Sequence, residues 1–387
     1  VIKKGCMLKK KILIVTERRA DYSKFRPIIK EIEQSSKLDY FLIVTGSHLL
    51  KEYGQTIRDI EKDGFKITAK FQMYTKQKGD TGREMVSALG KSIIHLSKFV
   101  EQLKPDIILS GFDIGANFAA AIVGAHMNKV VVHIEGGEVS GTIDDPIRHA
   151  TTRFAHIHCV TNSTAATRLI RMGENPKSVY VVGNPSLDSI RTIRKIPKNE
   201  LEKEFKIDLS NPLALVLQHT VTTELDSVEK NMKKTLDAIK ELNIQAILVH
   251  GNADAGSKKI SQITKNSKIK QYSTLSFEKY VNLLRSSSVL VGNSSSGIME
   301  APFLHIPSIN IGSRQSRRLQ SVSVIDVDYD KKAIKKAIKK AIHNKSFLTK
   351  CKNSKSLYGQ GYTSKKIIKI LEEINLKTIP IQKQIFY

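Results

Sequence analysis

One segment of the sequence combines acidic side chains with glycines directly after an expected strand. Residues 133–145 read HIEGGEVSGTIDD and follow the apolar residues 130–132. This acidic segment contains the four carboxylates Glu135, Glu138, Asp144 and Asp145. Carboxylates close to apolar surface are costly to bury and well suited to proton transfer. The chain has a formal net charge of +26. A local cluster of acidic side chains is unusual in such a basic chain and indicates a catalytic role.

Further candidate residues in the first half of the chain also follow expected strands. Arg19 and Lys24 lie where a strand ends and a helix begins. They could hold a diphosphate at the positive helix end, and ordinary helix capping is the alternative. His48 follows the next strand and either touches a ligand or only satisfies backbone groups. Asp113 follows a third strand and is either a proton-transfer group or a helix cap.

The second half of the chain offers small and polar residues at its own strand ends. Residues 292–302 read GNSSSGIMEAP, in which the backbone N–H groups and hydroxyls around a helix start form a natural diphosphate cradle. Glu300 in the following helix could accept hydrogen bonds from ribose hydroxyls. His219 could serve as acid, base or phosphate donor. The remaining nucleotide-binding candidates are Ser294, Ser295, Ser296, His250 and Asn252.

Composition narrows the classes of protein that fit. Lys and Arg number 63 against 37 Asp and Glu, but residues 331–342 place alanine and isoleucine on one helix stripe, so their lysines form a solvated face. We therefore expect an anionic small substrate and no nucleic acid. No run approaches the roughly 20 apolar residues of a membrane helix, no signal peptide is expected, and the residues before Lys9 are expected to carry no function. A cytoplasmic protein with three reduced cysteines is predicted.

Two pairs of residues suggest a metal site, but the sequence does not supply the further ligands that such a site needs. His133 and Glu135 are two residues apart, as are His156 and His158. Alternate residues of a strand point to the same face, so chelation is geometrically possible. No cysteine or further histidine completes a set at recognisable spacing. We therefore expect neither a metal nor a cofactor, and the absence of a Gly-x-Gly-x-x-Gly motif argues against a dinucleotide fingerprint.

The arrangement of short apolar runs and amphipathic stretches predicts α/β architecture. Expected strands at residues 12–16, 40–45, 106–110, 129–134 and 156–160 alternate with helices at 22–35, 84–103 and 118–127. A second series has strands at 213–218, 245–249, 289–292 and 308–311, with helices at 227–242 and 277–286. This pattern is typical of two Rossmann-like, doubly wound parallel sheets separated by a cleft. Ligands of such sheets bind beyond the carboxyl ends of the strands.

These motifs together resemble the hydrolysing UDP-N-acetylglucosamine 2-epimerases of sialic and legionaminic acid synthesis. The resemblance is carried by residues 19–24, the acidic segment, residues 147–150, 218–223, 254–258 and 292–295. It extends over nearly the whole chain and is particularly close to the epimerase half of the bifunctional UDP-GlcNAc 2-epimerase/ManNAc kinase. It implies a GT-B-like fold with an N-terminal domain at 1–187, a nucleotide-binding domain at 188–360, and a C-terminal helix and tail at 361–387 that cross back to the first domain.

The resemblance also implies a reaction and roles for residues. UDP is eliminated from UDP-GlcNAc as a base takes the C2 proton, and water then adds to the 2-acetamidoglucal, giving N-acetylmannosamine and UDP. Matching positions make Asp113, Glu135, Asp144 and His219 catalytic. Arg19, Lys24, Ser294, Ser295 and Glu300 match nucleotide contacts, and His48 and Arg148 match substrate-side positions. The expected partners are a nucleotide-sugar and further copies of the chain, in a homodimer or homotetramer.

Several positions depart from the family pattern. Phe112 and Ile114 flank Asp113 where the family usually has glycine and arginine, and Glu17 and Arg18 replace a small pair. These departures leave the sugar substituents at C4 and C6 and the nucleotide base open, with a UDP- or GDP-linked 2,4-diacetamido-2,4,6-trideoxy sugar as an alternative substrate. Further alternatives are a non-hydrolysing epimerase, a GT-B glycosyltransferase that needs an acceptor, and a basic nucleotide-binding protein without activity.

Overall fold

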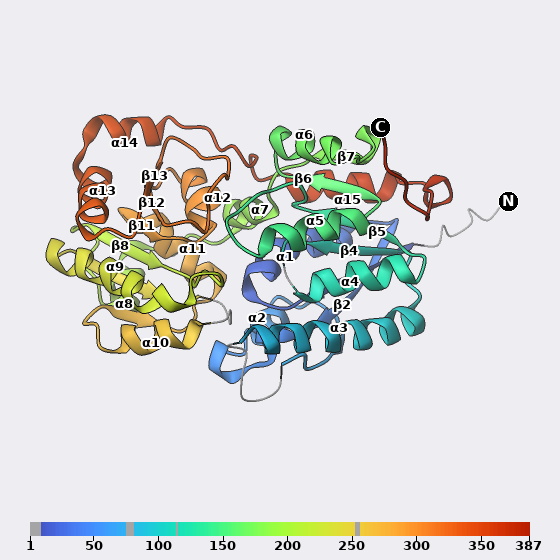
Figure 1. Ribbon diagram of the computed structural model, residues 1–387, viewed down its shortest axis with the longest axis horizontal. Helices are drawn as coiled ribbons and strands as arrows, with labels where there is room; N and C mark the ends of the chain where they lie inside the picture. The colour runs from blue at the N-terminus through green and yellow to red at the C-terminus, as the bar shows by residue number, and fades with distance from the viewer. Residues whose placement is uncertain (1–8, 75–80, 114, 252–255) are drawn as a thin grey trace.

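The chain forms two α/β domains, each built on a parallel sheet (Figure 1). The computed structural model describes residues 9–74, 81–113, 115–251 and 256–387. Ile114 and the predicted nucleotide contact Asn252 lie outside these described residues. Within them, the prediction of two doubly wound domains is confirmed.

The first sheet has seven strands in the order β3-β2-β1-β4-β5-β6-β7, all paired in parallel. Its central strands are apolar on both faces because helices cover both sides. The strands are β1 (Lys10–Thr16), β2 (Leu38–Val44), β3 (Ile67–Lys70), β4 (Ile107–Gly111), β5 (Val130–Ile134), β6 (Ile157–Val160) and β7 (Val179–Val181). The helices between them are α1 (Arg19–Gln34), α2 (Ile57–Lys62), α3 (Gly82–Leu103), α4 (Gly115–His126), α5 (Asp144–Phe154) and α6 (Ser163–Arg171).

The second sheet has six parallel strands in the order β10-β9-β8-β11-β12-β13. The strands are β8 (Leu213–Leu217), β9 (Gln245–Val249), β10 (Lys270–Tyr272), β11 (Val289–Gly292), β12 (Ser308–Ile311) and β13 (Val324–Val327). Its helices are α8 (Lys198–Phe205), α9 (Val228–Leu242), α10 (Ser257–Lys265), α11 (Phe277–Ser286), α12 (Ser296–Phe303), α13 (Lys331–His343) and α14 (Lys345–Lys352). In α13 the buried residues include Ile334 and Ile338, which confirms the predicted apolar stripe.

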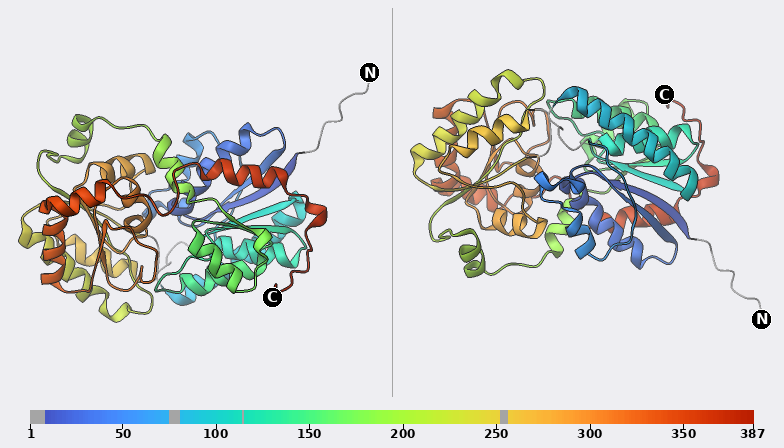
Figure 2. Two further views of the ribbon diagram at one scale, coloured as in Figure 1. Left: turned by 90° about the horizontal axis from the view of Figure 1, so that it is seen from above. Right: turned by 90° about the horizontal axis from the view of Figure 1, so that it is seen from below.

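Two helices connect the domains. The chain leaves the first domain through α7 (Pro185–Thr192) and returns through α15 (Thr363–Glu373), which packs on α1 (Figures 1 and 2). The buried carboxylate of Asp188 in α7 accepts hydrogen bonds from the backbone N–H groups of Thr363 (2.9 Å) and Ser364 (2.7 Å). Asp188 therefore caps the first turn of α15, so the outgoing and returning chains are fixed to each other.

The sequence patterns found the central strands but missed short edge strands. β3, β10 and β13 are only three or four residues long and partly exposed, so they lack the buried apolar runs that mark a central strand. Among the described residues, no helix is both long and apolar enough to cross a membrane. The free cysteines Cys159 and Cys351 are buried.

Candidate active site

A cleft between the two domains brings together most of the predicted site residues. Its walls are loops that follow β1, β4 and β5 in the first sheet and β8, β9, β11 and β12 in the second. This is the edge where parallel α/β sheets bind ligands. The predicted residues that line it are Arg19, Lys24, Asp113, Glu135, Asp144, His219, His250, Ser294, Ser295, Ser296 and Glu300.

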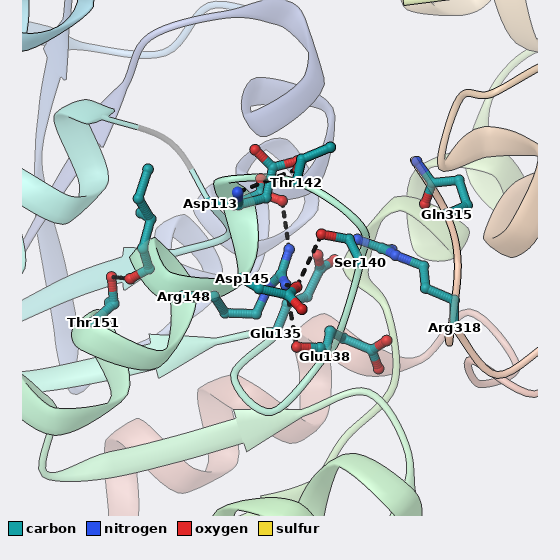
Figure 3. A network of polar contacts seen from close by, with 12 residues as sticks. Asp113, Glu135, Glu138, Ser140, Thr142, Asp145, Arg148, Thr151, Gln315 and Arg318 are labelled. Atoms are coloured by element: carbon teal, nitrogen blue, oxygen red, sulfur yellow. Dashed lines mark hydrogen bonds and ion pairs between the residues drawn. The ribbon is translucent and has the colours of Figure 1, made fainter. Parts of the chain in front are cut away.

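The four carboxylates of the acidic segment divide into two kinds. Glu135 and Asp144 line the cleft. Glu138 is turned into the scaffold, where its Oε1 accepts hydrogen bonds from Asn162 Nδ2 (2.8 Å) and the Thr161 hydroxyl. Asp145 likewise accepts from Arg148 Nη1 at 3.1 Å (Figure 3). Two of the four carboxylates therefore shape the segment, and two face the space in which a ligand would bind.

Two glycines allow the acidic segment to lie against its neighbours. Gly137 has a φ of +77°, and a Cβ there would lie 2.5 Å from the Ala165 carbonyl oxygen. Gly141 donates its N–H to the Arg314 carbonyl oxygen at 3.0 Å, and a Cβ there would lie 2.1 Å from the Ser313 carbonyl oxygen. The segment thus contacts α6 on one side and the second domain on the other.

Asp113 is held by a buried arginine. Arg148, in α5, is 2% exposed, and its Nη2 donates to Asp113 Oδ2 at 2.5 Å (Figure 3). Burial alone would raise the pKa of Asp113, but Arg148, Arg18 and Arg318 hold that pKa well below its usual range. Asp113 is therefore ionised at neutral pH. Arg148 lies behind Asp113 and does not itself line the cleft.

The pKa of Glu135 is shifted in the opposite direction to that of Asp113. Its Oε2 accepts a hydrogen bond from Lys24 Nζ at 2.6 Å. Burial raises the pKa of Glu135, and Lys24 only partly offsets this effect. Its Oε1 is also buried but has no hydrogen-bond partner among the described residues. Two nearby carboxylates whose pKa values are shifted in opposite directions are the usual arrangement for acid–base chemistry.

The backbone is strained at the two strand ends that carry these carboxylates. Phe112, after β4, has a φ of +69°, and Glu135, after β5, has a φ of +63°. Side chains other than glycine rarely adopt this left-handed conformation, which costs about 1–3 kcal/mol and is concentrated at functional sites. The Phe112 ring lies 4.4 Å below Lys24 Nζ, so the strained Phe112 supports the lysine that holds Glu135.

The loop after β1 is organised by a buried aspartate. Asp21 accepts hydrogen bonds from the backbone N–H groups of Glu17 (2.8 Å) and Arg18 (2.9 Å), and burial raises its pKa to about 6. This anchoring fixes the first turn of α1. Arg19 then reaches the second domain, where Nη1 donates to Thr274 Oγ1 at 2.8 Å and to the Leu275 carbonyl. Arg19 thus contacts both domains beside the cleft.

The facing wall is the start of α12. Ser294 and Ser295 precede the helix, and Ser296 begins it. The Ser296 hydroxyl donates to Glu300 and is hydrogen-bonded to the buried Tyr280 hydroxyl. The first N–H groups of a helix have no intrahelical acceptor and favour anions. This wall therefore combines N–H groups for a diphosphate with the carboxylate of Glu300.

His219 is placed by its neighbour at the end of β11. Its backbone N–H donates to Asn293 Oδ1 at 2.6 Å, and its carbonyl accepts from Asn293 Nδ2 at 2.9 Å. Gly251 lies against the His219 ring, where a Cβ would come 2.5 Å from Nδ1. His250 lines the cleft beside it, and its Nε2 is 3.0 Å from Gln271 Oε1.

Several cleft residues were not found from the sequence. Arg314, Gln315 and Arg318 follow β12 and line the cleft. Gln315 and Arg318 lie across from the acidic segment (Figure 3). Arg314 Nη2 lies 3.7 Å from Asp144 Oδ2. Arg318 Nε and Gln315 Oε1 are buried with no hydrogen-bond partner among the described residues. Their position after a buried strand was the available signal, because the strand-end rule applies there as well. Arg18 also lines the cleft.

Among the described candidates, His48 and Arg148 do not line the cleft, and His48 is built into the scaffold. It lies in the short 3₁₀ helix η1 (Gly46–Leu49) and is fully buried. Its Nε2 is 3.0 Å from Thr16 Oγ1 and its Nδ1 is 2.7 Å from Thr56 Oγ1. Both ring nitrogens are thus occupied within the scaffold, and burial lowers its pKa to about 3. In this structure His48 therefore connects parts of the scaffold and does not line the cleft.

The histidine pairs that suggested a metal are engaged otherwise. His158 Nε2 lies 2.9 Å from Glu174 Oε2, and His133 Nδ1 lies 3.2 Å from Thr152 Oγ1. Within the described part of the chain, no group of three or more His, Cys, Asp or Glu side chains is arranged to hold a metal ion.

The two parallel sheets that face each other across a cleft have GT-B-like architecture. The sequence profile of the UDP-N-acetylglucosamine 2-epimerase family matches residues 30–372. The chain belongs to this family and is an NDP-sugar 2-epimerase, as the sequence resemblance predicted.

Relatives with different named substrates are similarly distant from this chain. The UDP-N-acetylglucosamine 2-epimerase of Neisseria meningitidis is 35% identical over 84% of this chain and 85% of its own length. The UDP-N,N'-diacetylbacillosamine 2-epimerase (hydrolyzing) of Legionella pneumophila is 33% identical over 97% of this chain and 98% of its own. The fold is similar to that of a UDP-GlcNAc 2-epimerase from Neisseria meningitidis bound to UDP-GlcNAc, with a TM-score of 0.81, 19% identity, and coverage of 94% of this chain and 100% of the other.

Proposed function

We propose that the protein is a hydrolysing epimerase that converts UDP-GlcNAc and water into N-acetylmannosamine and UDP. One observation carries the proposal: Glu135 lines the cleft with one oxygen on Lys24, and its other oxygen is buried with no hydrogen-bond partner in the described part of the chain. Burial that raises its pKa also makes its ionised form a stronger base. A C2 proton of a sugar is weakly acidic, so such a base suits its removal.

In the proposed first step, ionised Glu135 takes the C2 proton while the bond between C1 and the UDP oxygen breaks. The C1–C2 double bond forms, and UDP leaves with the bonding electrons. The start of α12 and Arg19 would hold the diphosphate, and Arg314 and Arg318 would stabilise its growing charge. Glu300 would accept hydrogen bonds from the ribose hydroxyls.

In the proposed second step, water adds to C1 of the glycal and C2 receives a proton from the opposite face. Asp144 and His219 lie in the cleft and are the candidates for this proton transfer. Asp113 is held ionised by Arg148, so its proposed role is to stabilise positive charge that develops near C1 or to orient the water. The sum of the two steps is inversion at C2 with release of UDP.

The same reaction on a UDP- or GDP-linked 2,4-diacetamido-2,4,6-trideoxy sugar is the second candidate. It is favoured by the Legionella pneumophila relative and by a Campylobacter jejuni relative, 34% identical, named GDP/UDP-N,N'-diacetylbacillosamine 2-epimerase (hydrolyzing). Both names support hydrolysis over return of an epimerised nucleotide-sugar. The names of these relatives differ in the sugar, so the substituents at C4 and C6 of the sugar are what distinguishes the two candidates.

The test is a substrate panel in D₂O with mass analysis of the released sugar. The proposal predicts free UDP, N-acetylmannosamine and one deuterium at C2, without an added acceptor. A UDP-linked C2 epimer without free UDP would instead indicate a non-hydrolysing enzyme. Turnover of the diacetamido sugar alone would move the assignment to the second candidate. Absence of turnover on every panel member would reject both.

A further inference from the structure

A buried ionic cluster lies at the far end of α5, outside the cleft. Glu174 is 1% exposed and accepts hydrogen bonds from Arg153 Nη1 at 2.8 Å. It also pairs with His158 Nε2 at 2.9 Å and with Lys383 Nζ at 2.5 Å. We call these four residues the Glu174 cluster. None of the four lines the cleft.

Residues 379–387 form a strap that reaches this cluster. After α15 the chain turns back and runs toward α6 and β7 (Figures 1 and 2). The Ile381 carbonyl is 3.2 Å from His156 Nε2, and the Phe386 N–H donates to the Gly173 carbonyl at 2.9 Å. Ile385 and Phe386 remain about half exposed. Ile379 and Ile381 of the strap pack against the apolar core of the first domain, and Lys383 supplies its buried polar contact.

Lys383 also holds the last turn of α5. Its Nζ donates to the Thr152 carbonyl oxygen at 2.7 Å. Carbonyls in the last turn of a helix lack intrahelical donors, and the helix end carries partial negative charge. The Thr152 carbonyl already accepts the Ala155 N–H at 3.1 Å, so the Lys383 ammonium is its second donor and also offsets the partial negative charge of the helix end. Arg153, the next residue of α5, is joined to Glu174, so the strap and the helix end share one anion.

The opposite end of α5 belongs to the active site. Its first turns carry Asp144 and Arg148, and Arg148 holds Asp113. The Thr152 hydroxyl donates to the Arg148 carbonyl at 3.1 Å, so the residue that Lys383 grips is bonded directly to the turn that carries Arg148. The 11 residues of α5 span roughly 16 Å.

We propose that Lys383 is a positioning residue for the active site: by fixing the last turn of α5, it sets the angle at which the first turns present Asp144 and Arg148. The inference rests on the proposed function of that site. A tilt of about 5° over this helix length displaces the first turn by about 1.4 Å. Displacements near 1 Å at reacting groups lower rates by up to about 10²-fold.

The experiment compares Lys383→Met with Lys377→Met in the full chain. Both changes remove one positive charge from the same end of the chain, but Lys377 is exposed. Lys383→Met is expected to lower kcat by about tenfold or more with KM within about twofold, because the groups proposed to bind the nucleotide, Arg19 and the start of α12, lie outside α5. The affinity for UDP, the probe for nucleotide binding, is expected to stay unchanged. Amide hydrogen exchange in α5 is expected to accelerate, and Lys383→Arg is expected to restore part of kcat.

A value of kcat within about twofold of the Lys377→Met control would overturn the proposal, as would equal losses of kcat and UDP affinity. If Lys383→Met does not fold, Glu174→Gln/Lys383→Met removes both charges together and avoids an unpaired buried carboxylate. Wild-type kcat in that double variant would also overturn it. Failure of the proposed function is distinguishable, because the unmodified chain would then turn over no panel substrate. Exchange rates in α5 would still report whether Lys383 positions the helix.

Discussion

Replacing Arg148 by methionine tests whether the buried arginine exists to hold Asp113 in its ionised state. Arg148 is 2% exposed and Asp113 only 20% exposed, so solvent screens the pair weakly. Removing one partner of a buried ion pair costs about 3–5 kcal/mol because the other charge is left uncompensated. Arg18 and Arg318 still face Asp113, which places the expected loss of unfolding free energy near the lower end, at about 3 kcal/mol.

The assay is a double-mutant cycle by urea denaturation at pH 7. Asp113→Asn/Arg148→Met removes both charges, so its loss of stability should be smaller than the sum of the two single losses by at least about 1 kcal/mol. Activity should not recover in the double variant, because it lacks the carboxylate. Single losses that add within about 0.5 kcal/mol would refute the pairing.

The cycle also has a pH signature. In the wild-type chain the pKa of Asp113 is depressed, so its stabilising contribution is complete above the unfolded pKa of about 3.9. That contribution is lost as pH falls through the lower folded pKa. In wild type the positive charge of Arg148 offsets much of the increase in pKa that burial causes for Asp113. Without Arg148 this offset is lost, and the pKa of Asp113 rises. The stability difference between wild type and Arg148→Met should therefore shrink as pH falls from 7 through the unfolded pKa of about 3.9 and below it. A difference that stays constant over this whole range would contradict this reasoning.

Three further predictions concern the cleft. Glu135→Gln should lower kcat by about 10³-fold or more while UDP affinity changes little, because proton transfer alone contributes about 10²–10⁴-fold; comparable loss of both, by kinetics and calorimetry, would reassign Glu135 to binding. Lys24→Met should move the acid limb of the kcat–pH profile to higher pH, since Lys24 lowers the pKa of Glu135; an unmoved limb would argue against Glu135 as the base. Gly141→Ala should raise KM and reduce kcat, because its Cβ would come 2.1 Å from the Ser313 carbonyl. The matched control is Gly90→Ala, whose Cβ would meet nothing within 4 Å. Wild-type kinetics in both variants would show that the contact between the domains is dispensable.

The sequence was sufficient for the two sheets and for the edge at which the cleft lies. Buried parallel strands are marked by apolar runs, and the strand-end rule then locates the loops that carry Asp113, Glu135 and His219. The direction of a side chain in such a loop has no periodic signal. The sequence therefore left open whether His48 contacts a ligand, and its two ring nitrogens are in fact hydrogen-bonded to Thr16 and Thr56.

The directions of the side chains in the acidic segment have no signal in the sequence either. Four carboxylates in one loop look alike in sequence, but Glu138 meets Thr161 and Asn162 only after β6 has packed beside β5. Arg314 and Arg318 were missed for a related reason. Their loop has no glycine-rich or acidic motif. These arginines line the cleft because the loop of the second sheet faces the first domain.

The contact between Gly141 and Arg314 has a consequence for how this enzyme can diverge. The bond runs from one backbone N–H to one backbone carbonyl, so it leaves the side chain at 314 free to change. The Ser313 carbonyl, 2.1 Å from where a Cβ would be, restricts position 141 to glycine. A lineage can therefore exchange the cation beside Asp144 while the two loops still dock. The charge of the cleft wall can vary at this position while the contact between the two domains is kept.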